Sequence, residues 1–173
     1  MVTGKPLFTV NQIQEKVHEL AGRISEDYAG RDLLVVSLLK GAFMFTADLV
    51  KNIRIPLIID FMVVSSYAAD RSTGEVVIHS DVRERVEGRD VLIVEDIIDS
   101  GTTLNYVREH VLQKNPRTLK ICGLLDKRER RTVDVPIEYV GWEIPNLFVV
   151  GYGLDYDNKF RNLPYISVFK KTI

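Results

Sequence analysis

The stretch Val91–Leu104 decides the fold, and it reads Val-Leu-Ile-Val-Glu-Asp-Ile-Ile-Asp-Ser-Gly-Thr-Thr-Leu. Its first four residues are apolar without alternation, which is typical of a strand buried on both faces of a parallel sheet. Two adjacent carboxylates, a third carboxylate and a hydroxyl-rich turn follow, and helical spacing begins at Thr102. The stretch therefore predicts a buried strand, a polar turn and a helix, in that order.

Strand and helix patterns alternate along the rest of the chain. Apolar runs predict strands at 33–38, 56–64, 90–94 and 119–125, with a return strand at 76–79. Apolar residues three and four positions apart predict helices at 11–29, 42–52 and 102–114. Short β-like pieces follow at 137–140, 148–152 and 166–169. We therefore expect a single α/β domain over residues 1–173, with cap pieces from the N-terminus and from about 137–173.

Composition excludes several classes of protein. The chain has 173 residues, 46% of them hydrophobic and 27% charged, as in an ordinary globular domain. The 23 basic and 24 acidic residues leave a net charge of −1, so bulk charge does not favour nucleic acid as a partner. No apolar run reaches the roughly 18 residues that span a bilayer, and no leader peptide is recognised. The single cysteine, Cys122, fits a reducing compartment, so we expect a cytoplasmic protein with no membrane partner.

The polar turn after the central strand has the chemistry of a ligand site. In parallel sheets, the carboxyl ends of the strands form the ligand crevice. Backbone amides at a helix start, together with hydroxyl groups, can cradle a phosphate, and the residues offered here are Ser100, Gly101, Thr102 and Thr103. The adjacent carboxylates of Glu95 and Asp96 can hold Mg²⁺ or ribose hydroxyls. The alternative is an acidic strand end with an ordinary helix cap, but three carboxylates beside such a turn favour a functional site.

This turn resembles the phosphoribosyl pyrophosphate (PRPP) loop of the type I phosphoribosyltransferases. Four further segments, in order along the chain, are similar to the hypoxanthine-guanine phosphoribosyltransferases: Leu39–Gly41, Ser66–Gly74, Leu124–Arg128 and Phe148–Arg161. The resemblance implies the type I core, a central and mostly parallel sheet flanked by helices, with a small hood from the chain ends. It also implies a flexible lid at about 65–75 that carries Ser66 and Tyr67.

The resemblance implies a role for each polar residue around the ribose donor. Asp99 would belong to the PRPP-binding residues and would be the general base that takes the purine N7 proton. Glu95 and Asp96 would share one Mg²⁺, and Asp155 would bind a second. The pyrophosphate would contact Lys40, Gly41, Arg131 and Arg161. Without the resemblance, these cations would be interpreted as ordinary surface residues.

The purine side of the site is implied by the same resemblance. Lys127 would donate a hydrogen bond to the exocyclic oxygen at C6 of the base. Phe148 would stack on the ring, the Val149 backbone would bond its edge, and Asp155 would lie near C2. Thr102 stands where some relatives carry lysine, so one cationic partner of the phosphate is missing there.

The implied activity is transfer of the 5-phosphoribosyl group from PRPP to N9 of hypoxanthine or guanine. The products would be IMP or GMP and pyrophosphate, with Mg²⁺ as cofactor and a homodimer or homotetramer as the working form. The alternative is a PRPP-binding, RNA-binding regulator of the pyrimidine-operon attenuation type. Such a regulator would lack the segment Phe148–Tyr156 and would carry a longer basic face than the run Lys127–Arg131.

Overall fold

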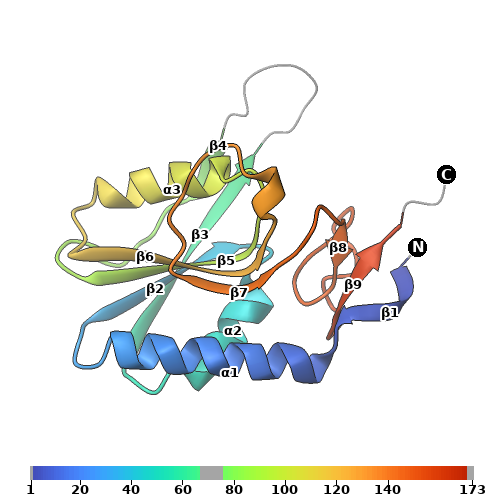
Figure 1. Cartoon of the computed structure of the whole chain (residues 1–173). Helices are drawn as coiled ribbons and strands as arrows, with labels where there is room; N and C mark the ends of the chain where they lie inside the picture. The colour runs from blue at the N-terminus through green and yellow to red at the C-terminus, as the bar shows by residue number, and fades with distance from the viewer. Residues whose placement is uncertain (1, 67–75, 171–173) are drawn as a thin grey trace.

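The computed structural model describes residues 2–66 and 76–170, and its centre is a twisted six-stranded sheet (Figure 1). The strand order is β4-β3-β2-β5-β6-β7. The strands are β2 (Leu33–Leu39), β3 (Leu57–Ser66), β4 (Val76–Ser80), β5 (Asp90–Ile98), β6 (Thr118–Asp126) and β7 (Tyr139–Glu143). All neighbours are parallel except β4, which returns antiparallel to β3. The expected mostly parallel α/β core is confirmed.

Helices cover both faces of this sheet, as Figure 1 shows. The helices α1 (Val10–Asp27) and α2 (Phe43–Asn52) lie on one face, and α3 (Thr102–Leu112) lies on the other. Alternate residues of each central strand enter opposite cores, so Val35 packs toward α1 and Val36 toward α3. This two-sided burial explains why the strands read as continuous apolar runs.

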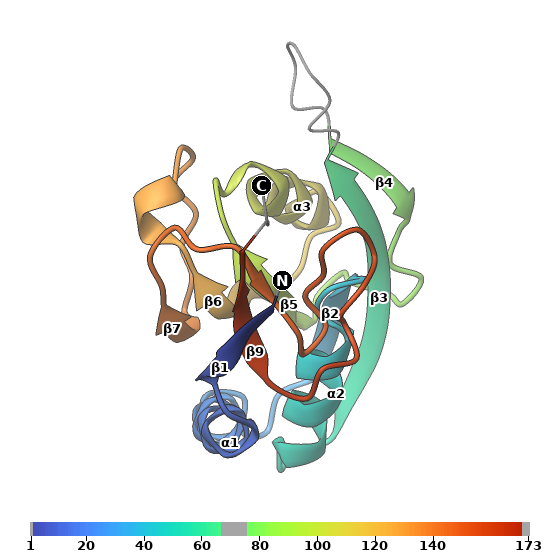
Figure 2. The ribbon, with the colours of Figure 1, turned by 90° about the vertical axis from the view of Figure 1, so that its right-hand side faces the viewer.

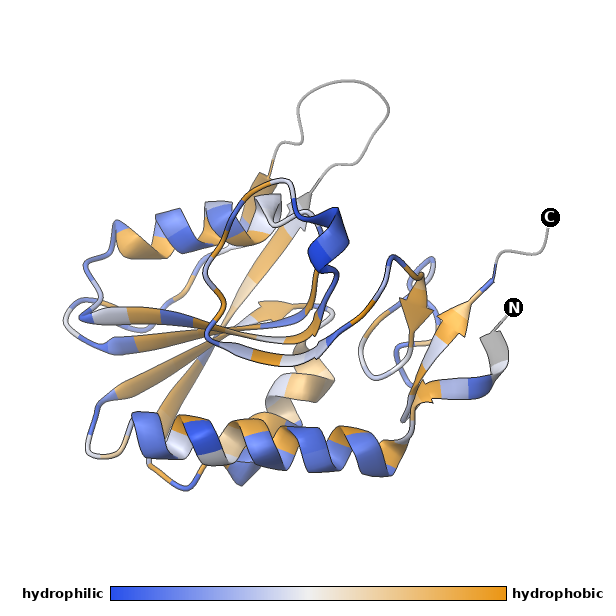
Figure 3. Ribbon diagram, in the orientation of Figure 1, coloured by the Kyte–Doolittle hydropathy of each residue, from blue (hydrophilic) through white to orange (hydrophobic). Residues whose placement is uncertain are grey.

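The first helix begins and ends where local chemistry requires it. Thr9 forms a capping box with Gln12, in which the threonine hydroxyl accepts from the Gln12 amide at 3.3 Å. Its buried face repeats every three or four residues, and Figure 3 shows apolar and polar residues alternating along it. The buried positions are Ile13, Val17, Leu20, Ala21, Ile24 and Ser25. Gly30, at φ 72°, follows the helix and turns the chain toward β2.

A small three-stranded sheet lies beyond the carboxyl ends of the large sheet's strands (Figures 1 and 2). It consists of β1 (Val2–Phe8), β9 (Ile166–Phe169) and β8 (Val149–Val150), in that order. Chain-end residues were expected to form a cap, but the strand in residues 2–8 was not predicted. The boundary expected at about 137 is wrong, because β7 pairs with β6 as the edge strand of the large sheet.

The central strand β5 is longer than its apolar run suggested. Pairing with β6 continues past Val94, with Glu95 opposite Gly123 and Ile98 opposite Asp126. Glu95 and Asp96 therefore lie inside the strand rather than after it. Ser66 is the last residue of β3, and Tyr67 with the rest of the predicted lid to residue 75 lies outside the described residues. Within residues 2–66 and 76–170, no helix is long and apolar enough to cross a membrane.

Candidate active site

The loop after β2 closely approaches the carboxylates of β5. A Cβ atom on Gly41 would overlap the carboxylate of Asp96, so only glycine fits there. The neighbouring Leu39–Lys40 peptide bond is cis, and the Lys40 side chain is exposed. The predicted pyrophosphate loop and the predicted metal-binding carboxylates are therefore side by side.

Glu95 and Asp96 form a crowded pair of carboxylates at the end of β5. The Asp96 amide donates to Glu95 Oε1 at 3.0 Å, and the Ile97 amide donates to Asp96 Oδ1 at 2.8 Å. Burial raises the pKa of both carboxyl groups, and the adjacent charge of Asp96 raises the pKa of Glu95 further. A bound cation would relieve this cost.

These carboxylates fit Mg²⁺ by the chemistry of their oxygens. Mg²⁺ prefers oxygen ligands and usually keeps several from water and substrate phosphates. Among the described residues, no group of three or more His, Cys, Asp and Glu side chains is placed to hold a metal ion. A pair such as Glu95 and Asp96 therefore suits an ion that arrives with a phosphorylated substrate.

The turn between β5 and α3 forms a cavity of about 340 Å³ at the start of the helix. Gly101 precedes α3 at φ 86° and has no side chain to cap the helix, while the Thr102 amide donates to the Ser100 hydroxyl at 3.4 Å. The Ser100 carbonyl accepts from the amides of Thr132 and Val133 at 2.9 and 3.1 Å, which braces the turn. The cavity is lined by Glu95, Ile97, Ile98, Asp99, Ser100, Gly101, Thr103, Leu104 and Arg130. Backbone amides at a helix start beside such a space can receive an anion.

Both oxygens of Asp99 contact cations. Lys127 Nζ lies 3.4 Å from Asp99 Oδ2, and Arg130 Nε donates to Asp99 Oδ1 at 3.1 Å. Lys127 is only 8% exposed, at the end of β6, and its amide donates to the Ile98 carbonyl at 2.9 Å. The sequence prediction included Asp99 and Lys127 but missed Arg130, whose only signal was its place in a short basic run.

Arg131, which the resemblance assigns to the pyrophosphate, contacts an acidic residue of β6 in the structure. Its guanidinium pairs with the buried carboxylate of Asp126, and its side chain packs beneath Gly101. In the order of the sheet, β5 lies between this position and the loop at Lys40. Arg131 directly follows the 3₁₀ turn η1 (Arg128–Arg130), and its side chain lies against Gly101 of the phosphate turn.

A third group of predicted residues comes from the segment after β8. Arg161 donates to the Gly153 carbonyl at 2.7 Å and pairs with Asp155 Oδ1 at 2.7 Å. Asp155 Oδ2 accepts from the Asn158 amide, also at 2.7 Å. A Cβ atom on Gly153 would overlap the Gly41 carbonyl, so this segment packs directly on the predicted pyrophosphate loop. The predicted second metal ligand and the predicted pyrophosphate arginine are thus paired with each other.

Phe148 offers an exposed aromatic face next to this segment. The residue is 51% exposed, and its ring meets Tyr156 edge-on, with centroids 5.6 Å apart and an interplanar angle of 83°. Val149 is buried in β8 and pairs with Val168 of β9. The fold therefore holds Phe148 at a fixed position while leaving ring surface free to stack on a planar ligand.

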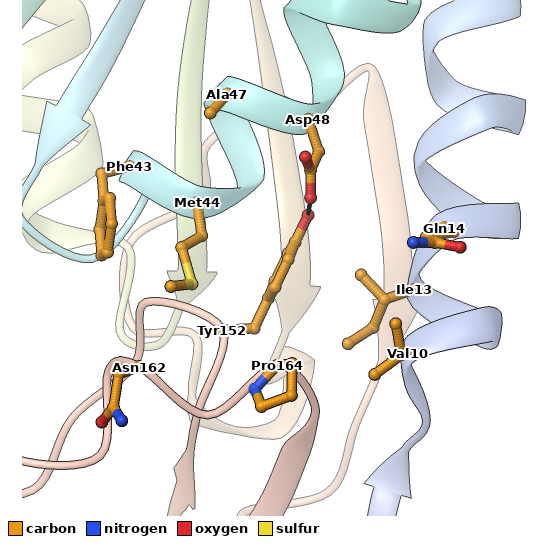
Figure 4. A pocket seen from close by; sticks show the side chains of 10 residues that line it. All are labelled: Val10, Ile13, Gln14, Phe43, Met44, Ala47, Asp48, Tyr152, Asn162 and Pro164. Atoms are coloured by element: carbon orange, nitrogen blue, oxygen red, sulfur yellow. Dashed lines mark hydrogen bonds between the residues drawn. The ribbon is translucent and has the colours of Figure 1, made fainter.

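A separate apolar cavity of about 350 Å³ lies between α1, α2 and the chain near Tyr152 (Figure 4). The Tyr152 hydroxyl crosses it to donate to Asp48 at 2.7 Å. Its lining includes Phe43 and Met44, which follow the Lys40–Gly41 loop, but none of the predicted site residues. It is therefore distinct from the cavity at the start of α3.

Comparisons with known proteins identify the family. The phosphoribosyl transferase domain family matches residues 8–157. A hypoxanthine-guanine phosphoribosyltransferase of Streptococcus thermophilus is 48% identical over 98% of this chain and 94% of its own length. The chain belongs to the hypoxanthine-guanine phosphoribosyltransferases.

Other relatives of this phosphoribosyltransferase agree. A hypoxanthine phosphoribosyltransferase of Salmonella typhimurium is 50% identical over 90% of the chain and 89% of the relative. The crystal structure of a hypoxanthine phosphoribosyltransferase from Staphylococcus aureus matches with a TM-score of 0.92 at 47% identity, covering 96% and 91% of the two chains. The predicted family and fold are confirmed, and the alternative of an RNA-binding regulator is not supported.

Proposed function

We propose that this enzyme transfers the 5-phosphoribosyl group from PRPP to N9 of hypoxanthine or guanine, producing IMP or GMP and pyrophosphate. One observation carries the proposal beyond family membership. The buried ammonium of Lys127 lies 3.4 Å from Asp99, at the strand end next to the phosphate turn. A donor for the base and an acceptor for its proton therefore stand together beside a site for the sugar phosphate.

Lys127 accounts for the choice of base. An ammonium group donates hydrogen bonds and cannot accept them, so it fits the 6-oxo group of hypoxanthine or guanine and not the 6-amino group of adenine. Because the side chain is buried, a mismatched base would leave its charge without a partner in a poorly hydrated place. Phe148 stacks on the purine ring, and the Val149 backbone contacts its edge. Asp155 lies toward C2.

The ribose donor spans the cleft from the phosphate turn to the loop after β2. Its 5-phosphate occupies the cradle at Ser100–Thr103, and its pyrophosphate meets Lys40, Gly41 and Arg161. Glu95 and Asp96 hold the ribose hydroxyls and one Mg²⁺, and Asp155 holds a second. When bound, Mg²⁺ offsets the negative charge that grows on the departing pyrophosphate. Arg161 offers a planar fork of donors to the same oxygens.

Asp99 acts as the general base. As N9 attacks C1 of the ribose, the proton at N7 must leave the purine, and the Asp99 carboxylate accepts it. Asp99 can do so only after a cation has moved off one of its oxygens. Lys127 makes that move when it turns from Asp99 to the purine oxygen.

Water must be kept from the electron-poor sugar that forms as pyrophosphate departs, because water would hydrolyse it. The segment 65–75 serves as the lid that closes over the site, with Ser66 and Tyr67 covering the reacting groups. This assignment rests on the resemblance of the sequence alone.

Self-association is part of the proposal. The strand β3 exposes Ile59 and Phe61, which lie on the face of the sheet that α1 and α2 partly cover, and α2 exposes Phe43. A dimer or tetramer would cover such a patch. Light scattering after size-exclusion chromatography should give two or four times the 19.7 kDa of the chain, and a monomer would contradict this part.

Product analysis tests the activity itself. The enzyme is incubated with PRPP, Mg²⁺ and either hypoxanthine or uracil, and nucleotides are separated by liquid chromatography. We expect IMP and an equal amount of pyrophosphate from hypoxanthine, with no UMP from uracil. UMP alone, or no nucleotide at all, would contradict the proposal.

A further inference from the structure

We propose that Arg130 is a further PRPP-binding residue, which neutralises the 5-phosphate in the cradle and leaves Asp99 as it does so. This inference rests on the proposed function and adds a residue that neither sequence pattern nor resemblance assigned. It starts from the charges around the phosphate cavity.

The cavity at the start of α3 lacks cations for a phosphate dianion. The turn Ser100–Thr103 contains no basic side chain, and Glu95 and Asp99 add negative charge to the wall. Of the described residues that line the cavity, Arg130 alone is positively charged. A bare helix N-terminus contributes only partial charge, so a phosphate beside two carboxylates needs a full cation.

Arg130 is placed to supply that cation. Its Nε donates to Asp99 Oδ1 at 3.1 Å, at the edge of the cavity, and its side chain is 53% exposed. The backbone is fixed, because the Arg130 amide donates to the Lys127 carbonyl at 2.8 Å. An ion pair this exposed contributes little net free energy, so exchanging a carboxylate for a phosphate is easy. The planar guanidinium also presents two parallel N–H groups that match phosphate oxygens.

Arg130 would exchange the Asp99 carboxylate for the 5-phosphate, and this exchange would link substrate binding to the general base. Without substrates, Lys127 and Arg130 each hold one oxygen of Asp99. The purine draws Lys127 away and the 5-phosphate draws Arg130 away, so Asp99 loses both of its cationic partners only when both substrates are bound. The carboxylate then meets the N7 proton with both former partners occupied elsewhere.

The test compares Arg130→Gln with Arg128→Gln. Both variants remove one arginine from the same 3₁₀ turn, but Arg128 lines a different cavity, with Asp126 and Asp134. Calorimetry should show the Kd of IMP rising about 10- to 100-fold in R130Q, the range expected for loss of a charged hydrogen-bonding partner, and staying unchanged in R128Q. In R130K, which keeps the charge, the loss should be smaller.

Three comparisons decide the outcome. IMP and inosine differ only in the 5-phosphate, so R130Q should lose affinity for IMP and keep its inhibition constant for inosine. Its KM for pyrophosphate in the reverse reaction should also be unchanged. Equal losses for IMP and inosine, or wild-type affinity for IMP, would overturn the inference. If wild type and R128Q form IMP while R130Q binds IMP with wild-type affinity, only the inference about Arg130 fails. If wild type forms no IMP, the proposed function itself fails.

Discussion

At the scale of single residues, the site is organised by exchangeable ion pairs rather than by fixed ones. Asp99 holds Lys127 and Arg130, and Asp155 holds Arg161. In every pair one partner is assigned to a substrate and the other to a proton or a metal ion. In the proposed mechanism, these pairs balance the charges of the free enzyme until PRPP and the purine replace the internal partners.

The variant Asp99→Asn tests the general base. We expect kcat to fall by about 10²- to 10⁴-fold, the usual contribution of a general base, because an amide cannot take the N7 proton. The Kd of PRPP should hardly change, since Asp99 does not bind the donor's charge. Asp157→Asn is the matched control, because Asp157 pairs only with Lys159 among the contacts described and is exposed. A D99N enzyme with wild-type kcat would remove Asp99 from this role.

At the scale of elements, prediction from sequence succeeded where the hydrophobic periodicity was strong. It failed where pairing with a distant strand determines whether a segment is a strand and where that strand ends. The bounds of β9 and the core of α1 follow from local patterns. Glu95 to Ile98 were predicted to follow a strand, because polar residues interrupt the apolar run. Their ladder with β6 keeps them in β5 nonetheless. The strand in residues 2–8 forms only because it pairs with β9, about 160 positions later, and no local pattern reveals such a partner.

The start of β5 provides a test of pH dependence. Asp90 is fully buried, and hydrogen bonds from Arg117 and Thr118 at the start of β6 lower its pKa. A carboxyl group with a lowered folded pKa stabilises the fold above its unfolded pKa of about 3.9, and that contribution is lost as the pH falls through the lower folded value. Wild type should therefore begin to lose stability as the pH falls below about 5, and the loss should continue until the pH is below the lowered folded pKa of Asp90.

The variant Arg117→Gln removes the main cause of the shift. We expect it to be less stable than wild type at pH 7 and to lose less stability on acidification, as measured by urea midpoints at each pH. Arg85→Gln is the control, because Arg85 makes only an exposed pair with Glu87 among the described contacts. Parallel acid profiles for wild type and R117Q would show that the Asp90 pair does not stabilise the junction of β5 and β6.

At the scale of the whole molecule, a net charge near zero conceals a cleft of two opposed signs. Strand ends and loops bring the acidic groups that we assign to metal and proton next to the basic groups that we assign to phosphate and base oxygens. The acidic groups are Glu95, Asp96, Asp99 and Asp155, and the basic groups are Lys40, Lys127, Arg130 and Arg161. Sequence resemblance supplied all of these except Arg130. Arg130 was not assigned because the direction of adjacent side chains depends on the 3₁₀ turn, and no residue pattern gives that direction.

Removal of Mg²⁺ tests how this charge balance is completed. With excess EDTA, we expect transfer to stop, because PRPP would bring its negative charge to the crowded carboxylates of Glu95 and Asp96 without a cation between them. Added Mg²⁺ should restore the rate. The unfolding midpoint should not move, because the apolar cores on the two faces of the sheet hold the fold without the ion. Full activity in EDTA would contradict the proposed metal ligands.

The central claim is that a buried lysine selects a 6-oxopurine for a ribose donor bound next to it. The most direct measurement is kcat/KM for hypoxanthine, guanine, xanthine and adenine in one assay with PRPP and Mg²⁺. A site built to donate to a substrate oxygen rejects an analogue that cannot accept by about 10⁴-fold or more, so adenine should fall at least that far below hypoxanthine or guanine. Adenine used as well as hypoxanthine would contradict the account.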